Sequence, residues 1–224
     1  MTTIAIIGAG PGLGQAAARR FGAEGFSVCL ISRNQTNVNE RAAELTSMGI
    51  TARGYAADVR DPQALRAALD AAAADLGTIE VLQYSPAPAK DMRGLIKPVL
   101  ETTAEDLVGP VEQSVYGSAT AVQQVLPGLY ELGHGTIIFV SGGSAVEPNG
   151  NLTGISVAFA AEHAYARMLH DALVPKGIHV AQVIIPDMIG GGDPDHEPDA
   201  IAERIWSAHS TRSGFQTIIG SDGA

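Results

Sequence analysis

The feature that most constrains this chain is a regular alternation of short apolar runs with longer, alanine-rich segments. The apolar runs are rich in Val and Ile, and the segments between them repeat apolar residues every three or four positions. This alternation is typical of βαβ units, in which helices cover both faces of a parallel sheet. The sequence therefore predicts an α/β fold, a doubly wound Rossmann-type parallel sheet of about seven strands.

The expected elements can be placed by residue range. The expected strands are Thr3–Ile7, Ser27–Ile31, Thr51–Ala56, Ile79–Tyr84, Gly135–Ser141, Ile178–Ile185 and Phe215–Ile219. The expected helices are Leu13–Ala23, Asn37–Met48, Pro62–Leu76, Ala104–Leu132, Ser156–Leu173 and Asp199–Ala208. We expect one domain over residues 1–224, because no low-complexity linker divides the chain and 46% apolar residues can fill one sizeable core.

Charge and cysteine content exclude several classes of function. The net charge is -10 and no run of Lys or Arg occurs, which argues against binding to nucleic acid or to an anionic membrane. Cys29 is the only cysteine, so no internal disulfide forms. No apolar run is long enough to span a bilayer, and the first strand starts without a signal sequence. We expect a soluble, cytoplasmic protein.

A glycine-rich turn, GAGPGLG at residues 8–14, follows the first expected strand and leads directly into a helix. Glycine lets the backbone turn tightly and approach a diphosphate closely. The free N–H groups and positive end of the following helix attract the negative charge. The turn therefore predicts a dinucleotide site. The alternative is a tight turn that serves packing only.

The spacing Gly8-x3-Gly12-x-Gly14 resembles that of the short-chain dehydrogenase/reductase family. The resemblance continues in AADVRD (56–61), EDLVGPVEQSVYGSATAVQQVLP (105–127) and PKGIHVAQVIIPD (175–187), and it extends over essentially the whole chain. It implies an NAD(P) cofactor, with Asp58 and the Val59 backbone at the adenine. The cofactor-binding residues it implies are Gly8, Gly10, Pro11, Gly12, Leu13, Gly14, Ser32, Arg33, Asp58, Val59, Ser85, Pro186 and Ile189.

The same resemblance implies a homodimer or homotetramer, paired through the helices expected at 104–132 and 156–173. The polar segment at 187–199 corresponds to the family's substrate loop, in a shortened form.

The end of the second expected strand bears on which cofactor is bound. Ser32 stands where NAD-preferring members carry an acid for the ribose hydroxyls, and Arg33 follows it. A guanidinium pairs with a phosphate through two hydrogen bonds and a permanent charge. We therefore expect NADP(H) rather than NAD(H). The alternative is an arginine that is merely solvated at a strand end.

The family's catalytic groups are missing. Members use a Tyr-x3-Lys pair, a Ser before it and an Asn on the preceding helix; here Ile155, Phe159, Gly142 and Ser114 stand at those four positions. The lysines of the chain are Lys90, Lys97 and Lys176, and none lies four residues after a tyrosine. Because neither Ile nor Phe can transfer a proton, we expect the cofactor site to be retained without ordinary Tyr-dependent catalysis.

Other polar residues are candidates for a substitute catalytic group. The resemblance places Ser141, Ser114, Tyr84 and Tyr116 nearest the reacting centre, although a packing role is the simpler interpretation of both tyrosines. His163 shares a helix face with Ile155 and Phe159, although a position at the solvent or at a subunit interface is the simpler interpretation.

We expect no metal site. Two imidazoles, His163 and His170, lack a third ligand, and the loop residues Asp193, Asp195, His196 and Glu197 fit a solvated surface.

Three functions remain open at this stage. The first is an NADP(H)-binding protein related to the family. The second is an NADP-dependent oxidoreductase that acts on a small carbonyl or alcohol with a non-standard proton donor. The third is a structural partner protein that has lost its ligand. For the first two functions, the expected ligands are the dinucleotide and an unidentified small molecule.

Overall fold

The computed structural model describes residues 2–88 and 92–220 and forms one seven-stranded parallel sheet of order β3-β2-β1-β4-β5-β6-β7. The strands are β1 (Thr3–Ile7), β2 (Ser27–Ser32), β3 (Ala52–Ala56), β4 (Ile79–Tyr84), β5 (Gly135–Gly142), β6 (Ile178–Ile185) and β7 (Gln216–Ile218). Each strand pairs in parallel with its neighbour, so the α/β prediction is confirmed.

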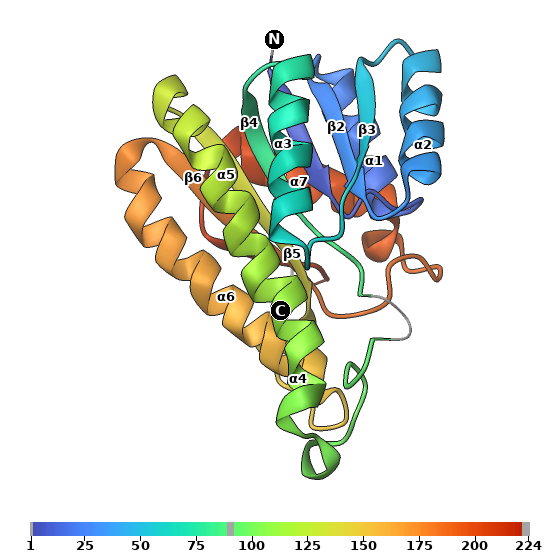
Figure 1. The fold of residues 1–224 in the computed structure, drawn as a ribbon, viewed down its shortest axis with the longest axis vertical. Coiled ribbons are helices and arrows are strands. Elements are labelled where there is room, and N and C mark those ends of the chain that lie inside the picture. The colour runs from blue at the N-terminus through green and yellow to red at the C-terminus, as the bar shows by residue number, and fades with distance from the viewer. Residues whose placement is uncertain (1, 89–91, 221–224) are drawn as a thin grey trace.

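Helices cover both faces of this sheet (Figure 1). They are α1 (Leu13–Ala23), α2 (Gln35–Ser47), α3 (Pro62–Leu76), α4 (Ala104–Val111), α5 (Gly117–Leu132), α6 (Thr153–Leu173) and α7 (Pro198–Thr211). Helices α1, α2 and α7 enclose one apolar core, in which Phe21 and Ile205 are fully buried. Helices α3, α5 and α6 enclose the other core around Leu69 and Phe139. The doubly wound arrangement is therefore confirmed.

The long helix expected at 104–132 is interrupted. A π-helical turn, Glu112–Tyr116, separates α4 from α5, although the chain keeps a helical path through it. Pro110 lies just before this turn and has no N–H to donate, which weakens the regular hydrogen-bond ladder there. The π turn adds a residue to the helix and turns Gln113 toward the cleft described below.

Two helix starts follow from side-chain capping. The Asn34 side chain accepts a hydrogen bond from Asn37 N, so α2 begins at Gln35, two residues earlier than predicted. The Asp61 side chain accepts from the backbone N–H groups of Gln63 and Ala64, with Pro62 as the first helical residue of α3.

The strand order places a crevice at the carboxyl ends of β1 and β4. Strands β2 and β3 extend the sheet on one side of β1, and β4 begins the other half. In open α/β sheets, ligands bind at this switch point, because the two connecting loops diverge there. The Ser85 N–H donates to the Ile7 carbonyl at 2.9 Å and joins the two strand ends at the floor of the crevice.

A buried histidine lies far from the crevice, where α7 packs against α1 and β5. The His209 ring packs near Phe21, Phe26 and Trp206, and its Nδ1 is 2.9 Å from Thr136 Oγ1. Burial is the main cause that lowers the pKa of His209 to about 4, and the charge of Arg212 adds to it. The ring is therefore neutral in the folded protein at neutral pH.

We predict that His209 makes the protein acid-sensitive. Between pH 6.5 and about 4 the unfolded chain protonates this histidine and the folded protein does not, so the free energy of unfolding falls as the pH falls through that window. The loss attributable to His209 over the whole window is about 3 kcal/mol. Urea denaturation of His209→Gln should show a shallower slope against pH. The difference at pH 8 measures the packing change alone, and an unchanged slope would contradict the prediction.

Candidate functional site

The glycine turn after β1 packs against the start of the loop after β4. Gly8 has φ +99, and a Cβ there would lie within 2.5 Å of the Ser85 carbonyl carbon. A Cβ on Gly14 would come within 2.8 Å of Ala9 Cα. By contrast, nothing lies within 4 Å of a Cβ built on Gly12. Two of the glycines are thus required for packing, while Gly12 leaves the backbone open to the crevice.

The N-terminus of α1 faces this opening. Gly12 is its N-cap, no side chain caps it, and the first turn holds no acidic residue. The N–H groups of a first helical turn have no acceptor within the helix, and together with the helix dipole they favour an anion. The turn therefore fits a diphosphate.

A cleft of three adjoining compartments runs along the carboxyl ends of the strands. The first compartment is bounded by the glycine turn and the ends of β2 and β3. Its lining includes Gly8, Gly10, Pro11, Ser32, Arg33, Asp58 and Val59, all predicted from the sequence. The structure thus brings these seven residues together around one cavity.

Two further residues of α2 line the first compartment and were missed by the sequence reasoning. Asn37 and Arg41 stand on the α2 face turned toward Arg33. The Nε of Arg41 is buried and has no hydrogen-bond partner in the described residues. Arg33 is exposed, and its charge contributes to lowering the Asp58 pKa. The four-residue spacing of Asn37 and Arg41 on a helix that Asn34 caps is the signal that could have found them.

Asp58 is tied to its neighbour Arg60. The Asp58 carboxylate accepts from Arg60 N at 2.9 Å and from an Arg60 guanidinium nitrogen at 3.1 Å. Partial burial acts to raise the Asp58 pKa, but these hydrogen bonds and the Arg60 charge lower it overall. The carboxylate is therefore charged and fixed at the rim of the first compartment.

The second compartment adjoins the opening of the glycine turn. It is lined by Gly12, Leu13, Gly14, Ser85 and Ile189, among the predicted residues, and by Ser141 at the end of β5. Pro186 instead lines the third compartment. All thirteen cofactor-site residues expected from the sequence thus lie along the same cleft.

Ser141 is held by a buried hydrogen-bond chain. Its Oγ accepts from Gln182 Nε2 at 2.9 Å, and Gln182 Oε1 pairs with His163 Nδ1 on α6. Because Gln182 occupies an acceptor position of Ser141, the hydroxyl hydrogen remains available to donate. His163 therefore acts inside the structure rather than at the surface, and it lines none of the three compartments.

Phe159 separates the second compartment from the third. It lines both, as do Gly142, Ile185 and Asp187, while Ile155 lines the third. A Cβ on Gly142 would be 3.4 Å from Phe159 Cε2. The phenyl ring therefore occupies the space toward which a serine at position 142 would point.

Three of the proposed catalytic residues do not reach the cleft. Tyr84 is fully buried and its hydroxyl donates to the Gln113 carbonyl. Burial, followed by the charges of Glu162 and Asp58, raises the pKa of Tyr84 well above its usual value. The structure therefore places the Tyr84 hydroxyl in the core and not among the residues that line the compartments.

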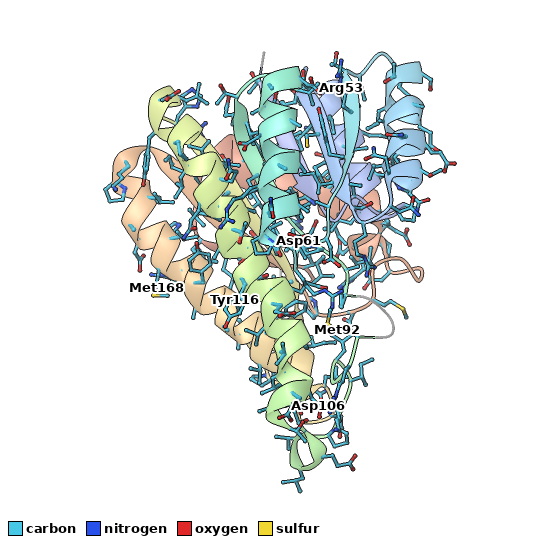
Figure 2. All side chains as sticks on the ribbon, in the orientation of Figure 1. Arg53, Asp61, Met92, Asp106, Tyr116 and Met168 are labelled. Atoms are coloured by element: carbon cyan, nitrogen blue, oxygen red, sulfur yellow. The ribbon has the colours of Figure 1, made fainter. Side chains whose placement is uncertain are left out.

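Tyr116 and Ser114 both lie outside the cleft, Tyr116 because it is exposed and Ser114 because it is buried. Tyr116 is 60% exposed on the outer side of the helical layer, where Figure 2 shows it. Ser114 is buried, and the π turn presents its neighbour Gln113 to the cleft instead. Neither Tyr116 nor Ser114 lines the three compartments, and Ser141 is the one candidate of the four that does.

Comparison with known proteins identifies the fold family. The family model described as short chain dehydrogenase matches residues 2–191. The chain belongs to this family. It therefore has a dinucleotide-binding fold, and its family consists of oxidoreductases that use NAD(P)(H).

Individual relatives are distant. The "Short-chain reductase protein NovJ" of Streptomyces niveus is 28% identical over 200 residues, which cover 89% of this chain and 72% of that protein. "Sulfoacetaldehyde reductase 2" of Chromohalobacter salexigens is 29% identical over 189 residues, 80% of this chain and 70% of that protein.

Solved structures show the same fold. A short-chain dehydrogenase from Rhodopseudomonas palustris has a TM-score of 0.85 at 26% identity and covers 97% of both chains. An NADPH-bound short-chain oxidoreductase of Pseudomonas aeruginosa PAO1, described as containing an atypical catalytic center, has a TM-score of 0.85 at 19% identity, and the match covers 99% of this chain and 97% of that chain.

Within residues 2–88 and 92–220, no helix combines the length and apolarity that a membrane crossing requires.

We predict that Gly8 supports the cleft by close packing. Gly8→Ala combines a positive φ with a clash against the backbone of Ser85 and Pro86, so it should lower the free energy of unfolding by at least about 2 kcal/mol. Gly25→Ala is the matched control, because Gly25 has φ +88 in open space and should cost only about 1 kcal/mol. Urea denaturation compares them, and equal losses would refute the packing role.

Proposed function

We propose that this protein binds NADP(H) and lacks ordinary Tyr-dependent catalysis. One contrast carries the proposal. The first compartment gathers Arg33 and Arg41, whereas the third presents Ile155 and Phe159 where the family has its proton-transfer pair. The cofactor half of the site is kept and the reactive half is rewritten.

Different residues of the cleft would bind different parts of the cofactor. The open backbone at Gly12 and the end of α1 would hold the diphosphate, and Asp58 and Val59 would border the adenine. The two guanidinium groups, with Asn37, would hold the ribose 2′-phosphate. The buried, unpartnered Nε of Arg41 is the donor that such a phosphate would satisfy.

When bound, a reduced nicotinamide supplies a hydride. The side chains around the second compartment then determine what accepts it. Phe159 offers no proton and no cation, and a positioned acid is worth about 10²–10⁴ in rate. A developing alkoxide next to Phe159 would also lack electrostatic stabilisation.

The hydrogen-bond chain that ends at Ser141 favours a second candidate function, an oxidoreductase with a non-standard proton donor. Ser141 is the hydroxyl at the strand end, and the bond from Gln182 leaves its hydrogen free to polarise a carbonyl. Assays of a carbonyl panel by NADPH absorbance test this candidate. This candidate requires that the unmodified protein reduces a carbonyl and that Ser141→Ala does so more slowly. Equal rates in the unmodified protein and in Ser141→Ala would exclude Ser141 as the donor.

We further propose that the protein is a homodimer or homotetramer in the cytoplasm. Helix α6 packs against the π turn that precedes α5, and these two elements carry the exposed apolar residues Tyr116, Val157 and Met168, of which Figure 2 labels Tyr116 and Met168. Such a surface is self-complementary when two copies meet about a two-fold axis. Light scattering of Met168→Glu compared with the unmodified chain checks it, since a charge at that face should reduce the molar mass.

We predict a preference for NADPH over NADH that depends on both arginines. Arg33→Ala and Arg41→Ala should each weaken NADPH binding about tenfold or more, because each removes a charged hydrogen bond to the phosphate, and should leave NADH binding almost unchanged. Calorimetric titration measures both. Arg66→Ala, on the exposed side of α3, is the control and should change neither. Equal affinity for the two cofactors in the unmodified protein would contradict the proposal.

We also predict that Gly12 admits the diphosphate. Gly12→Val adds a side chain in space that the fold leaves open, so thermal stability should change little while the affinity for both cofactors falls at least about tenfold. Thermal unfolding with and without NADPH separates the two effects. Retained cofactor binding would place the diphosphate elsewhere.

A further inference from the structure

The third compartment combines an apolar wall with acidic side chains. Ile155, Phe159 and Leu152 supply hydrocarbon, and the carboxylates of Asp187 and Glu147 complete the lining. No Lys or Arg lines it among the described residues. This distribution disfavours an anionic ligand and complements a cationic one.

Asp187 is the best placed of the two carboxylates. It lines both the second and the third compartments, and its side chain is 82% exposed. The Nε2 atom of His196 lies 3.9 Å from Asp187 Oδ2. Within residues 2–88 and 92–220 no arginine or lysine forms an ion pair with Asp187, and such a carboxylate can pair with a ligand cation.

Phe159 adds a second attraction for positive charge. Its side chain lines both the second and the third compartments, where the proposed cofactor would meet a substrate. The negative face of an aromatic ring attracts a cation held above it. Phe159, which stands at the position of the family's lysine, thus also provides an aromatic surface.

We propose that the cleft takes an apolar iminium ion, a substrate whose C=N⁺ group already carries the positive charge. The proposal rests on the proposed binding of NADP(H) and names the substrate class for that same site. An iminium ion accepts the hydride at its carbon: the C–H bond forms, the C=N π pair moves to nitrogen, and a neutral amine results. NADPH is oxidised to NADP⁺, and no proton is consumed.

The apolar residues at the positions of the family's proton-transfer pair are consistent with this chemistry. A ketone becomes an alkoxide and needs an acid, which Ile155 and Phe159 cannot supply. An iminium ion loses its charge during reduction, so no anion develops beside the phenyl ring. The carboxylate of Asp187 and the ring of Phe159 would hold the cation before the reaction.

Binding tests the proposal without turnover. Calorimetry compares the permanently cationic N-methyl-dihydroisoquinolinium with the neutral ketone tetralone, which has a similar bicyclic shape. We expect the cation to bind about tenfold more tightly in the cofactor-free protein. Asp187→Asn should reduce that preference about threefold to tenfold. Asp195→Asn, in the same loop but outside the cleft lining, should not change it.

Two further variants and an assay complete the experiment. Glu147→Gln and Phe159→Leu should each reduce the preference, and thermal unfolding verifies that both fold. NADPH consumption should occur with the iminium ion above the protein-free rate and should not occur with tetralone. The pH dependence of the rate with the iminium ion should show no titration of a proton-donating group of the protein.

Equal binding of tetralone and the cation, or an Asp187→Asn variant that behaves like Asp195→Asn, would overturn the iminium proposal while NADPH binding stands. Failure of NADPH itself to bind would overturn both proposals.

Discussion

The close approach of the glycine turn to the backbone after β4 is the constraint on which the rest of the site depends. Gly8 leaves no room for a side chain between the turn and Ser85, and the Ser85 N–H bonds the end of β1. This contact joins the two halves of the sheet at their switch point. It also aims the start of α1 into the crevice, so that the open backbone at Gly12 and the two arginines by α2 lie along one cleft.

The reactive end of the cleft is organised by a different contact. Phe159 stands at the position of the family's lysine and Gly142 at that of its serine. The phenyl ring packs toward Gly142, which has no side chain. The substitutions form a packed unit rather than isolated losses. Polar chemistry survives beside it, in the Ser141 hydroxyl fixed through Gln182 and in the carboxylate of Asp187. This combination separates the two proposals for catalysis: one needs a hydroxyl donor, and the other needs none.

Much of the fold could be predicted because its signals are local. Alternating apolar runs placed all seven strands to within one or two residues, and the glycine spacing placed the turn. The errors arose where packing competes with local pattern. The π turn at Glu112–Tyr116 broke a helix that reads as continuous, and it exchanged Ser114 for Gln113 at the cleft. Arg41 was missed because its position facing Arg33 depends on how α2 sits against β2 and β3.

The sequence by itself determined the α/β architecture, the family resemblance and the absence of the Tyr-x3-Lys pair, since periodicity, glycine spacing and residue identity are properties of the chain alone. Only the tertiary structure decided which polar residues share the cleft. Tyr84 sits at a strand end as expected, yet its side chain enters the core, and His163 reaches Ser141 only through Gln182 on another strand. The direction of a side chain at the end of a strand depends on the helices that pack over it, and those contacts join residues far apart in the sequence.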